Sequence, residues 1–212
     1  KSAGLRLQAG RDIEIVNPDH DPRYKELWQE YHRLLGRGGV TPSLAKLRMR
    51  ADTTLIGSML LRRSDVDAMI CGTQGQLSRH LQHVNDVIGL RPNAHCFATM
   101  NMLLLPRHTL FMCDTYINED PDAAQLAEIT LMAADEVRRF GLTPKVALLS
   151  HSNFGSKQTQ SARKMSDALR IVRARDPDLE VDGDMHGDAA LSQEIRDQLY
   201  PECRLKGEAN LL

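Results

Sequence analysis

Small polar side chains gather in the segment 150–156, directly after an apolar run and before a helical pattern. The residues of this segment that could do chemistry are Ser150, His151, Ser152, Asn153 and Ser156. Hydroxyl, amide and backbone N–H groups at the end of a strand and the start of a helix favour anions. The pattern is therefore consistent with a phosphate or acyl-phosphate site.

Two other interpretations of the same segment stay open. It can be an ordinary strand-to-helix loop in which serines cap the helix. It can also hold a serine nucleophile served by His151, although residues adjacent in sequence rarely reach the geometry that activates a hydroxyl.

A second polar cluster lies at 182–188, where three carboxylates accompany one imidazole. These are Asp182, Asp184, His186 and Asp188. Such a group can bind a divalent metal or transfer protons, but its spacing is not that of a calcium loop. Helix capping by Asp188 and turn formation are the favoured explanation of the cluster, and we predict no metal site.

Three further pairs of residues lie next to predicted strands or helices. Asp114 and Thr115 come after the apolar run 110–113, and Gly72 with Thr73 comes after 66–71. The glycine segment lacks both the dinucleotide and the phosphate-loop fingerprints. Arg79 and Arg91 flank the next helix and can pair with a pyrophosphate or simply solvate a helix face.

The elements that must position these groups alternate along the chain. Helical spacing of apolar residues predicts helices at 22–35, 42–49, 55–60, 77–88, 121–140, 161–175 and 187–199. Short apolar runs predict strands at 13–16, 66–71, 96–105, 110–113, 146–149 and 179–181, with a hairpin turn at 106–108. This alternation favours an α/β fold, in which ligands collect at the carboxyl ends of parallel strands.

The composition bounds the class of protein. The 212 residues are 42% hydrophobic, and 27 basic residues nearly balance 28 acidic ones. We therefore expect a globular protein with no broad field for nucleic acid or anionic membranes. No apolar run approaches the roughly 20 residues of a membrane span, and we expect no signal peptide. Cys71, Cys96, Cys113 and Cys203 form no CxxC pair, so we expect reduced thiols and a cytoplasmic location.

The chain is expected to be a fragment of a longer protein. It begins without methionine and ends in an apolar run, 209–212, that predicts a strand. We place a first α/β lobe at 1–105 and an incomplete second lobe at 106–212.

Several of these segments together resemble the phosphate acetyl/butyryltransferase family, over almost the whole chain. Its helix start is matched by Gly39-Val40-Thr41 and its Ala-Asp-Ala/Gly-Met strand by 66–72. The stretch 114–129, with Asp114, Asn118 and Gln125-Leu126-Ala127-Glu128-Ile129, is similar to the family's Asp-Cys-Ala-Ile-Asn-Pro region. The segments 146–152 and 182–190 match its serine loop and its Asp-Gly-Glu-x-Gln-x-Asp-Ala-Ala motif. The resemblance implies a three-layer α/β/α fold with a mostly parallel sheet, like isocitrate and isopropylmalate dehydrogenases.

The serine loop and the acidic motif, in the particular sequences found at 148–156 and 185–188, resemble more narrowly the C-terminal region of bacterial hybrid NADP-dependent malic enzymes. That resemblance implies an N-terminal malic enzyme module that uses NADP and a divalent metal, Mg or Mn, with no cofactor in this segment. It also implies a homo-oligomer, at least a dimer, and regulation by acetyl-CoA or a related acyl-CoA. Thr115 stands where the transferases usually have cysteine, and their arginine has no clean match, Arg79 lying about a turn away.

Three functions remain open at this point: an acyl-CoA-responsive regulatory region, an active phosphate acetyltransferase, and a purely structural dimerisation module. For the first two we expect one ligand site, for acyl-CoA or acyl phosphate. Its expected residues are Gly72, Thr73, Arg79, Asp114, Thr115, Ser150, His151, Ser152, Asn153 and Ser156.

Overall fold

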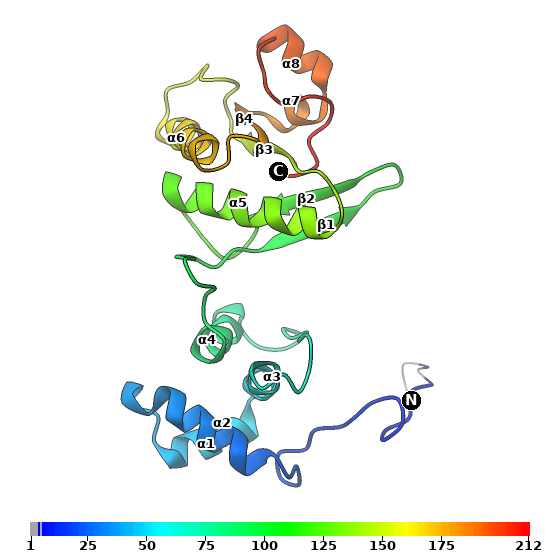
Figure 1. Ribbon diagram of the computed structural model, residues 1–212, viewed down its shortest axis with the longest axis vertical. Helices are drawn as coiled ribbons and strands as arrows, with labels where there is room; N and C mark the ends of the chain where they lie inside the picture. Colours follow the sequence, from blue (N-terminus) through cyan, green and yellow to red (C-terminus); the bar gives the residue numbers. More distant parts are fainter. Residues whose placement is uncertain (1–3, 5) are drawn as a thin grey trace. The chain divides into compact units, whose positions relative to one another are not determined.

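The computed structural model describes residue 4 and residues 6–212 (Figure 1). It consists of two compact units, unit 1 up to Gly89 and unit 2 from Leu90 to Leu212. The lobe boundary expected at 105/106 falls between two strands that pair with each other, whereas the contacts divide the chain at Gly89/Leu90. Each unit is described on its own.

Unit 1 is helical in its described residues. Its elements are α1 (Tyr24–Leu35), the short 3-10 helix η1 (Gly36–Gly38), α2 (Pro42–Ala51), α3 (Thr53–Arg62) and α4 (Leu77–Val87). Helices α2 and α3 begin where short polar side chains accept backbone N–H groups: Thr41 accepts from Leu44, and Asp52 accepts from Thr54 and Leu55. The predicted helices at 22–35, 42–49, 55–60 and 77–88 are therefore confirmed, with small changes in their bounds.

The core of unit 1 lies between these helices. Its buried apolar residues are Leu27, Tyr31, Val40, Ala45, Met49, Leu55, Ile56, Met59, Leu60 and Val87. The first helix thus buries Leu27 and Tyr31, whereas Trp28 packs only partly against this core.

Two strands predicted in unit 1 are wrong. The run 66–71 has no regular structure, and Ile70 is 98% exposed. The run 13–16 contributes one isolated bridge, between Ala9 and Ile13. An apolar run indicates that its residues are buried, but a strand also needs a neighbouring strand to pair with its backbone N–H and C=O groups. The described residues of unit 1 supply no such neighbour.

Unit 2 contains the sheet. The hairpin of β1 (Met100–Leu104) and β2 (Thr109–Cys113) is antiparallel, and β3 (Lys145–Leu149) pairs in parallel with β4 (Glu180–Met185). Residues 210–212 join the two pairs, because Leu211 bridges in parallel to both Phe111 and Val146. The hairpin is confirmed. Its first strand, predicted at 96–105, is formed only by Met100–Leu104, the second half of the predicted run. The apolar run near the end of the chain is extended as predicted.

Helices cover both faces of this sheet. Val146 and Leu148 of β3 pack into a core with α5 (Ala123–Arg139) and α6 (Gln160–Arg175). Ala147, the residue between them, packs instead with α7 (Gly187–Leu191) and the segment 203–209. Alternate residues of a strand point to opposite faces, so unit 2 has three layers, and the predicted α/β class is confirmed. Figure 1 shows the β1–β2 hairpin extending beyond the other strands.

Local sequence sets the helix bounds of unit 2. Helix α5 starts at a capping box, in which the Asp122 side chain accepts from the Gln125 N–H and the Gln125 side chain accepts from the Asp122 N–H. The single helix predicted at 187–199 is wrong in one respect: it breaks at Ser192, whose hydroxyl caps α8 (Gln193–Leu199). Within the described residues, no helix has both the length and the apolar character needed to cross a membrane.

Candidate functional site

A cavity of about 250 Å³ opens at the carboxyl ends of β2 and β3 in unit 2. Asp114 and Thr115 line it after β2, and Leu148 and Leu149 line it from β3. The strands and residues 210–212 run parallel, so their ends meet at one edge of the sheet, as expected for ligand sites in α/β proteins. The structure therefore brings the 114–115 segment together with the end of the strand that precedes Ser150.

The carboxylate of Asp114 is fully used within the protein. Oδ1 accepts hydrogen bonds from the backbone N–H and the hydroxyl of Thr99, at 3.0 and 2.6 Å. Oδ2 accepts from the backbone N–H and the Nδ2 of Asn118, at 2.8 and 2.6 Å. Burial raises the pKa of Asp114, but the hydrogen bonds from Thr99 and Asn118 outweigh it and leave the pKa below its usual value. Asp114 thus fixes the turn after β2 rather than offering a free oxygen.

The serine loop 150–157 is also held by its own hydrogen bonds. Ser152, 1% exposed, accepts the Lys157 N–H at 3.1 Å, and its hydroxyl lies 3.3 Å from that of Ser156. Ser156 in turn accepts the Asn153 N–H at 3.1 Å. The backbone N–H groups of Phe154, Gly155 and Ser156 have partners as well. Most of the loop's backbone donors, expected to be free for an anion, are therefore occupied.

His151 and Asn153 lie on the outside of this loop and make separate contacts. The imidazole of His151 is within hydrogen-bond distance of the Thr159 and Ser161 hydroxyls, at 3.0 and 3.5 Å. The side chain of Asn153 accepts the His186 N–H at 2.7 Å, which ties the loop to the end of β4. The contacts of His151 thus point toward the start of α6 and not toward a serine of 150–156.

Two polar atoms at the same strand ends have no hydrogen-bond partner among the described residues. They are the Ser150 hydroxyl and Oδ2 of Asp184, both buried. Asp184 is 1% exposed, and its other oxygen accepts the Gly155 N–H at 2.9 Å. The backbones of the two strands meet here, because the Ser150 N–H donates to the Met185 carbonyl at 2.9 Å. Buried polar atoms are normally paired, so these two atoms are polar groups that the described residues leave unsatisfied at the strand ends.

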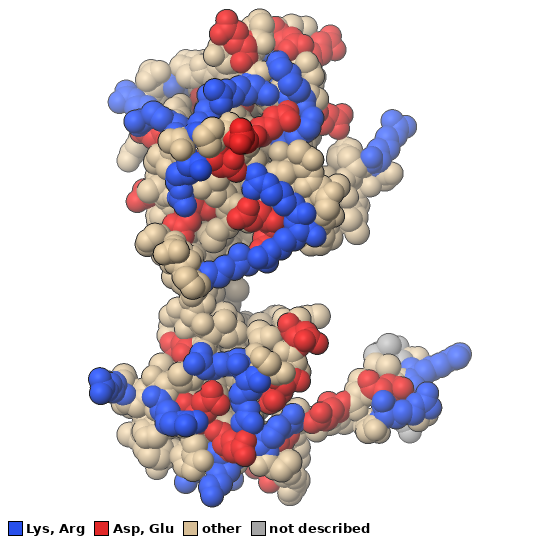
Figure 2. Space-filling view, in the orientation of Figure 1, with Lys and Arg blue, Asp and Glu red and all other residues tan. Residues whose placement is uncertain are grey.

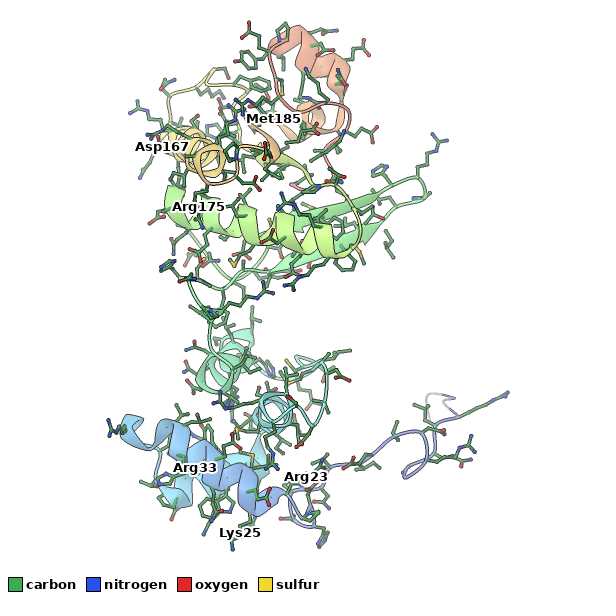
Figure 3. The ribbon with its side chains drawn as sticks, viewed as in Figure 1. Arg23, Lys25, Arg33, Asp167, Arg175 and Met185 are labelled. Carbon is green, nitrogen blue, oxygen red and sulfur yellow. The ribbon has the colours of Figure 1, made fainter. Side chains whose placement is uncertain are left out.

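Asp182, the first carboxylate of the acidic cluster, has a structural role. Its side chain is 4% exposed and forms an ion pair of 2.8 Å with Arg173 of α6. Its second oxygen accepts the Arg204 N–H at 2.7 Å. No group of three or more His, Cys, Asp or Glu residues able to hold a metal exists in the described residues. Met185, labelled in Figure 3, is buried at the end of β4 against α7.

The remaining expected site residues belong to unit 1. Gly72 and Thr73 lie in an exposed segment without regular structure, and Gly72 has a φ of +101°. Arg79 donates from Nε to Asp52 Oδ2 at 3.0 Å, with its side chain 67% exposed. His83 shares the same oxygen at 2.8 Å. Arg79 therefore keeps its terminal guanidinium nitrogens in solvent, where they can meet an anion.

Surface charge does not single out one region. Lys and Arg residues are interspersed with Asp and Glu residues over both units on the face shown in Figure 2, in keeping with the net charge of −1. Any attraction for a phosphate group is therefore local, as expected from the composition.

The sequence of the chain matches a family model along its whole length. The model is described as "Phosphate acetyl/butaryl transferase" and matches residues 1–212. The chain belongs to this family. The resemblance inferred from the motifs is thereby confirmed.

Relatives in the phosphate acetyl/butaryl transferase family include malic enzymes. The chain is 52% identical to the NADP-dependent malic enzyme of Escherichia coli, over 99% of this chain and 28% of that protein. It is 48% identical to the NAD-dependent malic enzyme of Rhizobium meliloti, over 99% of this chain and 27% of that protein. The chain thus spans somewhat over a quarter of the length of these relatives.

A solved phosphotransacetylase has the same fold. The enzyme from Streptococcus pyogenes superposes with a TM-score of 0.86 at 26% sequence identity, over 99% of this chain and 63% of that one. The family's fold is therefore shared, while the sequence is much nearer to the malic enzymes.

Proposed function

We propose that this chain is the acyl-CoA-responsive and oligomer-forming region of an NADP-dependent malic enzyme. In the proposed parent protein, a separate N-terminal module oxidises malate to pyruvate and CO2 with NADP and Mg or Mn. The observation that carries the proposal is the contrast in identity, 52% to a malic enzyme against 26% to a phosphotransacetylase. NADP rather than NAD, and a location in the cytoplasm, form part of the same proposal.

The strand-end geometry supports a CoA thioester as the effector. Pantetheine carries two amide N–H groups, and a local opening of the strand ends would let such donors pair with the buried, unpartnered Asp184 Oδ2 and Ser150 hydroxyl. A buried carboxylate repels phosphate, so the phosphates belong further out. Exposed cations near the start of α6, such as Lys157 and Arg163, suit them.

Regulation requires that the effector bind one state of the assembly more tightly than another. The measurement is malate oxidation by the full-length protein with increasing acetyl-CoA. Inhibition that saturates is expected, and an unchanged rate at millimolar acetyl-CoA would refute the regulatory role. Titration with NADP and NAD in the same assay tests the cofactor.

Phosphate acetyltransferase activity is a second candidate, favoured by the family and by the fold shared with phosphotransacetylases. Ser150, Ser152 and Asn153 would then orient an acyl phosphate. Thioester absorbance after mixing acetyl phosphate with CoA detects this reaction directly. Calorimetry with acetyl-CoA separates both ligand-binding functions from a purely structural dimerisation module, for which no heat of binding is expected.

We expect the hydrogen bonds of the serine loop to be needed for inhibition by acetyl-CoA. The double substitution Ser152→Ala and Asn153→Ala removes the acceptor of the Lys157 N–H and the tie to His186. We expect acetyl-CoA to inhibit the variant more weakly, while uninhibited turnover stays close to that of the parent. An identical inhibition curve would remove this loop from the effector site.

A further inference from the structure

Phe154, in the middle of the serine loop, has a backbone conformation that L-residues rarely adopt. Its φ is +48°, and the φ of Gly155 after it is +77°. Glycine accepts this left-handed region without cost, whereas a residue with a Cβ is strained there. Such strain persists only where the surrounding structure holds the residue in place. The conformation of Phe154 therefore requires a compensating contact.

Hydrogen bonds attach the backbone of this turn to β4. The Phe154 N–H donates to the Asp184 carbonyl at 2.6 Å, and the Gly155 N–H donates to Asp184 Oδ1 at 2.9 Å. A glycine at position 154 could make the same backbone bond and would not be strained. The hydrogen bonds thus do not account for an aromatic side chain at this position.

The ring of Phe154 makes the contact that the backbone does not explain. It packs against the core that contains Met185 of β4, Ala189 of α7 and Cys203. Its centroid lies 5.0 Å from that of the Tyr200 ring, with an angle of 34° between the two planes. Aromatic pairs at this separation are favourable beyond the area that they bury.

Tyr200 is held in place independently of the serine loop. It follows α8, and its N–H donates to the Arg196 carbonyl at 2.7 Å. Its own carbonyl accepts the Cys203 N–H at 3.0 Å. The residue is 40% exposed, so it lies at the surface. Tyr200 therefore offers the ring of Phe154 a fixed partner.

We infer that the pair of Phe154 and Tyr200 positions the serine loop in its strained turn and thereby sets the sensitivity of the protein to its effector. The inference rests on the proposed function, because it assumes that the serine loop lies at the effector site. Ser152 and Asn153 come directly before Phe154, and the pair acts through them without touching the effector. When only a fraction of the molecules holds a binding conformation, the apparent affinity falls by that fraction.

The test is Tyr200→Ala in the full-length protein. Because Tyr200 lies at the surface, the substitution removes one ring of the pair without opening a buried cavity. The energy of an aromatic pair corresponds to a shift of roughly two- to tenfold in an equilibrium. We expect the acetyl-CoA concentration that gives half-inhibition of malate oxidation to rise by this factor, while turnover and KM without acetyl-CoA stay as in the parent protein.

Two further variants separate the pair from general effects on α8. Tyr200→Phe keeps the ring and should retain the inhibition curve of the parent protein. Leu199→Ala is the matched control, since Leu199 lies at the end of the same helix, is 51% exposed and is outside the aromatic pair. If Leu199→Ala weakened inhibition as much as Tyr200→Ala, loosening of α8 would explain both, and the inference would be overturned. If Tyr200→Ala does not fold, Tyr200→Leu makes the same test.

Hydrogen–deuterium exchange reports the position of the loop in the absence of effector. Tyr200→Ala should accelerate exchange in peptides covering 150–157 by roughly two- to tenfold, because the bonded N–H groups of the loop open more often. Tyr200→Phe should exchange like the parent protein. Equal exchange of these peptides in Tyr200→Ala and the parent protein would show that the pair does not position the loop.

The failure of this inference differs from that of the proposed function. Inhibition of the parent protein by acetyl-CoA that persists unchanged in Tyr200→Ala overturns the inference alone. A parent protein that acetyl-CoA does not inhibit overturns the proposed regulatory role and, with it, the role of the pair in sensitivity.

Discussion

Replacing Arg196 by methionine is expected to loosen the segment between α8 and the last strand. Arg196 is fully buried, and its guanidinium donates only to backbone carbonyls. Nη1 donates to those of Ala189 and Ala190, at 2.6 and 3.1 Å, and Nη2 to those of Leu205, at 3.3 Å, and Gly207. The side chain therefore joins the end of α7 to the segment that leads into residues 210–212.

The size of the effect follows from these four bonds. A hydrogen bond to a charged group contributes about 1.5–3 kcal/mol, and a buried acceptor left without its donor costs about 1–3 kcal/mol. Methionine keeps the apolar stem and removes the donors. At about 1.4 kcal/mol for each factor of ten, the open form of the segment should become roughly 10² to 10³ times more populated.

Cys203 reports this opening. It is 2% exposed, and burial raises the pKa of its thiol to about 11, so it should react slowly with alkylating reagents. We expect Arg196→Met to accelerate its alkylation, measured by peptide mass spectrometry, by the same roughly 10² to 10³. Cys71 is exposed and serves as an internal control of reagent activity.

Arg170→Met is the matched control substitution. Arg170 lies on α6 with its side chain 78% exposed and pairs with Asp167 on the same helix, so its loss should leave Cys203 protected. Equal labelling rates of Cys203 in the parent protein and in Arg196→Met would refute the role assigned to Arg196.

Three further substitutions test the framework of unit 2. Asp114→Asn should lower the free energy of unfolding by about 3–5 kcal/mol at pH 7, because an amide turns two of four accepted hydrogen bonds into donor–donor contacts. The folded pKa of Asp114 lies below its unfolded value of about 3.9, so its stabilisation is present above that pH and lost on acidification. Urea unfolding should thus show the difference between variant and parent shrinking toward pH 3, and a constant difference would contradict the carboxylate's role. Gly183→Ala, at a φ of +151°, would place a Cβ 2.7 Å from the Leu148 carbonyl oxygen, and should cost about 1–3 kcal/mol in the same measurement. Ser192→Ala removes the cap on the Ile195 N–H and should cost about 1 kcal/mol, with no change expected if α7 and α8 formed one helix.

Sequence patterns predicted the elements of unit 2 where local interactions decide them. The start of α5 follows from Asp122 and Gln125, which form a capping box independent of the rest of the fold. The apolar run 146–149 is a strand because the sheet and the helices bury it on both faces. The break at Ser192 was missed although a serine cap can be recognised from sequence.

Features that depend on distant partners could not be predicted in this way. The run around Ile70 has the composition of a buried strand, yet no strand among residues 6–212 pairs with it. Nothing in the spacing of α8 distinguishes Arg196, which faces the carbonyls of a later segment, from an ordinary surface arginine.

The same distinction between local patterns and distant partners applies to the candidate site. The position of Asp114 and Ser150 at one edge of the sheet follows from strand alternation. The roles of their atoms do not, because Asp114 is saturated by Thr99 and Asn118 while the Ser150 hydroxyl and Asp184 Oδ2 are left unpaired. Asp184 belongs to the acidic cluster recognised in the sequence, but its burial beside the serine loop could not be predicted without the fold.

Hydrogen–deuterium exchange of the full-length protein with and without acetyl-CoA tests most directly that a CoA thioester binds at the carboxyl edge of this sheet. Slower exchange is expected in peptides covering 113–118 and 149–157, the segments that follow β2 and β3. Unchanged exchange in both segments at saturating acetyl-CoA would contradict the account.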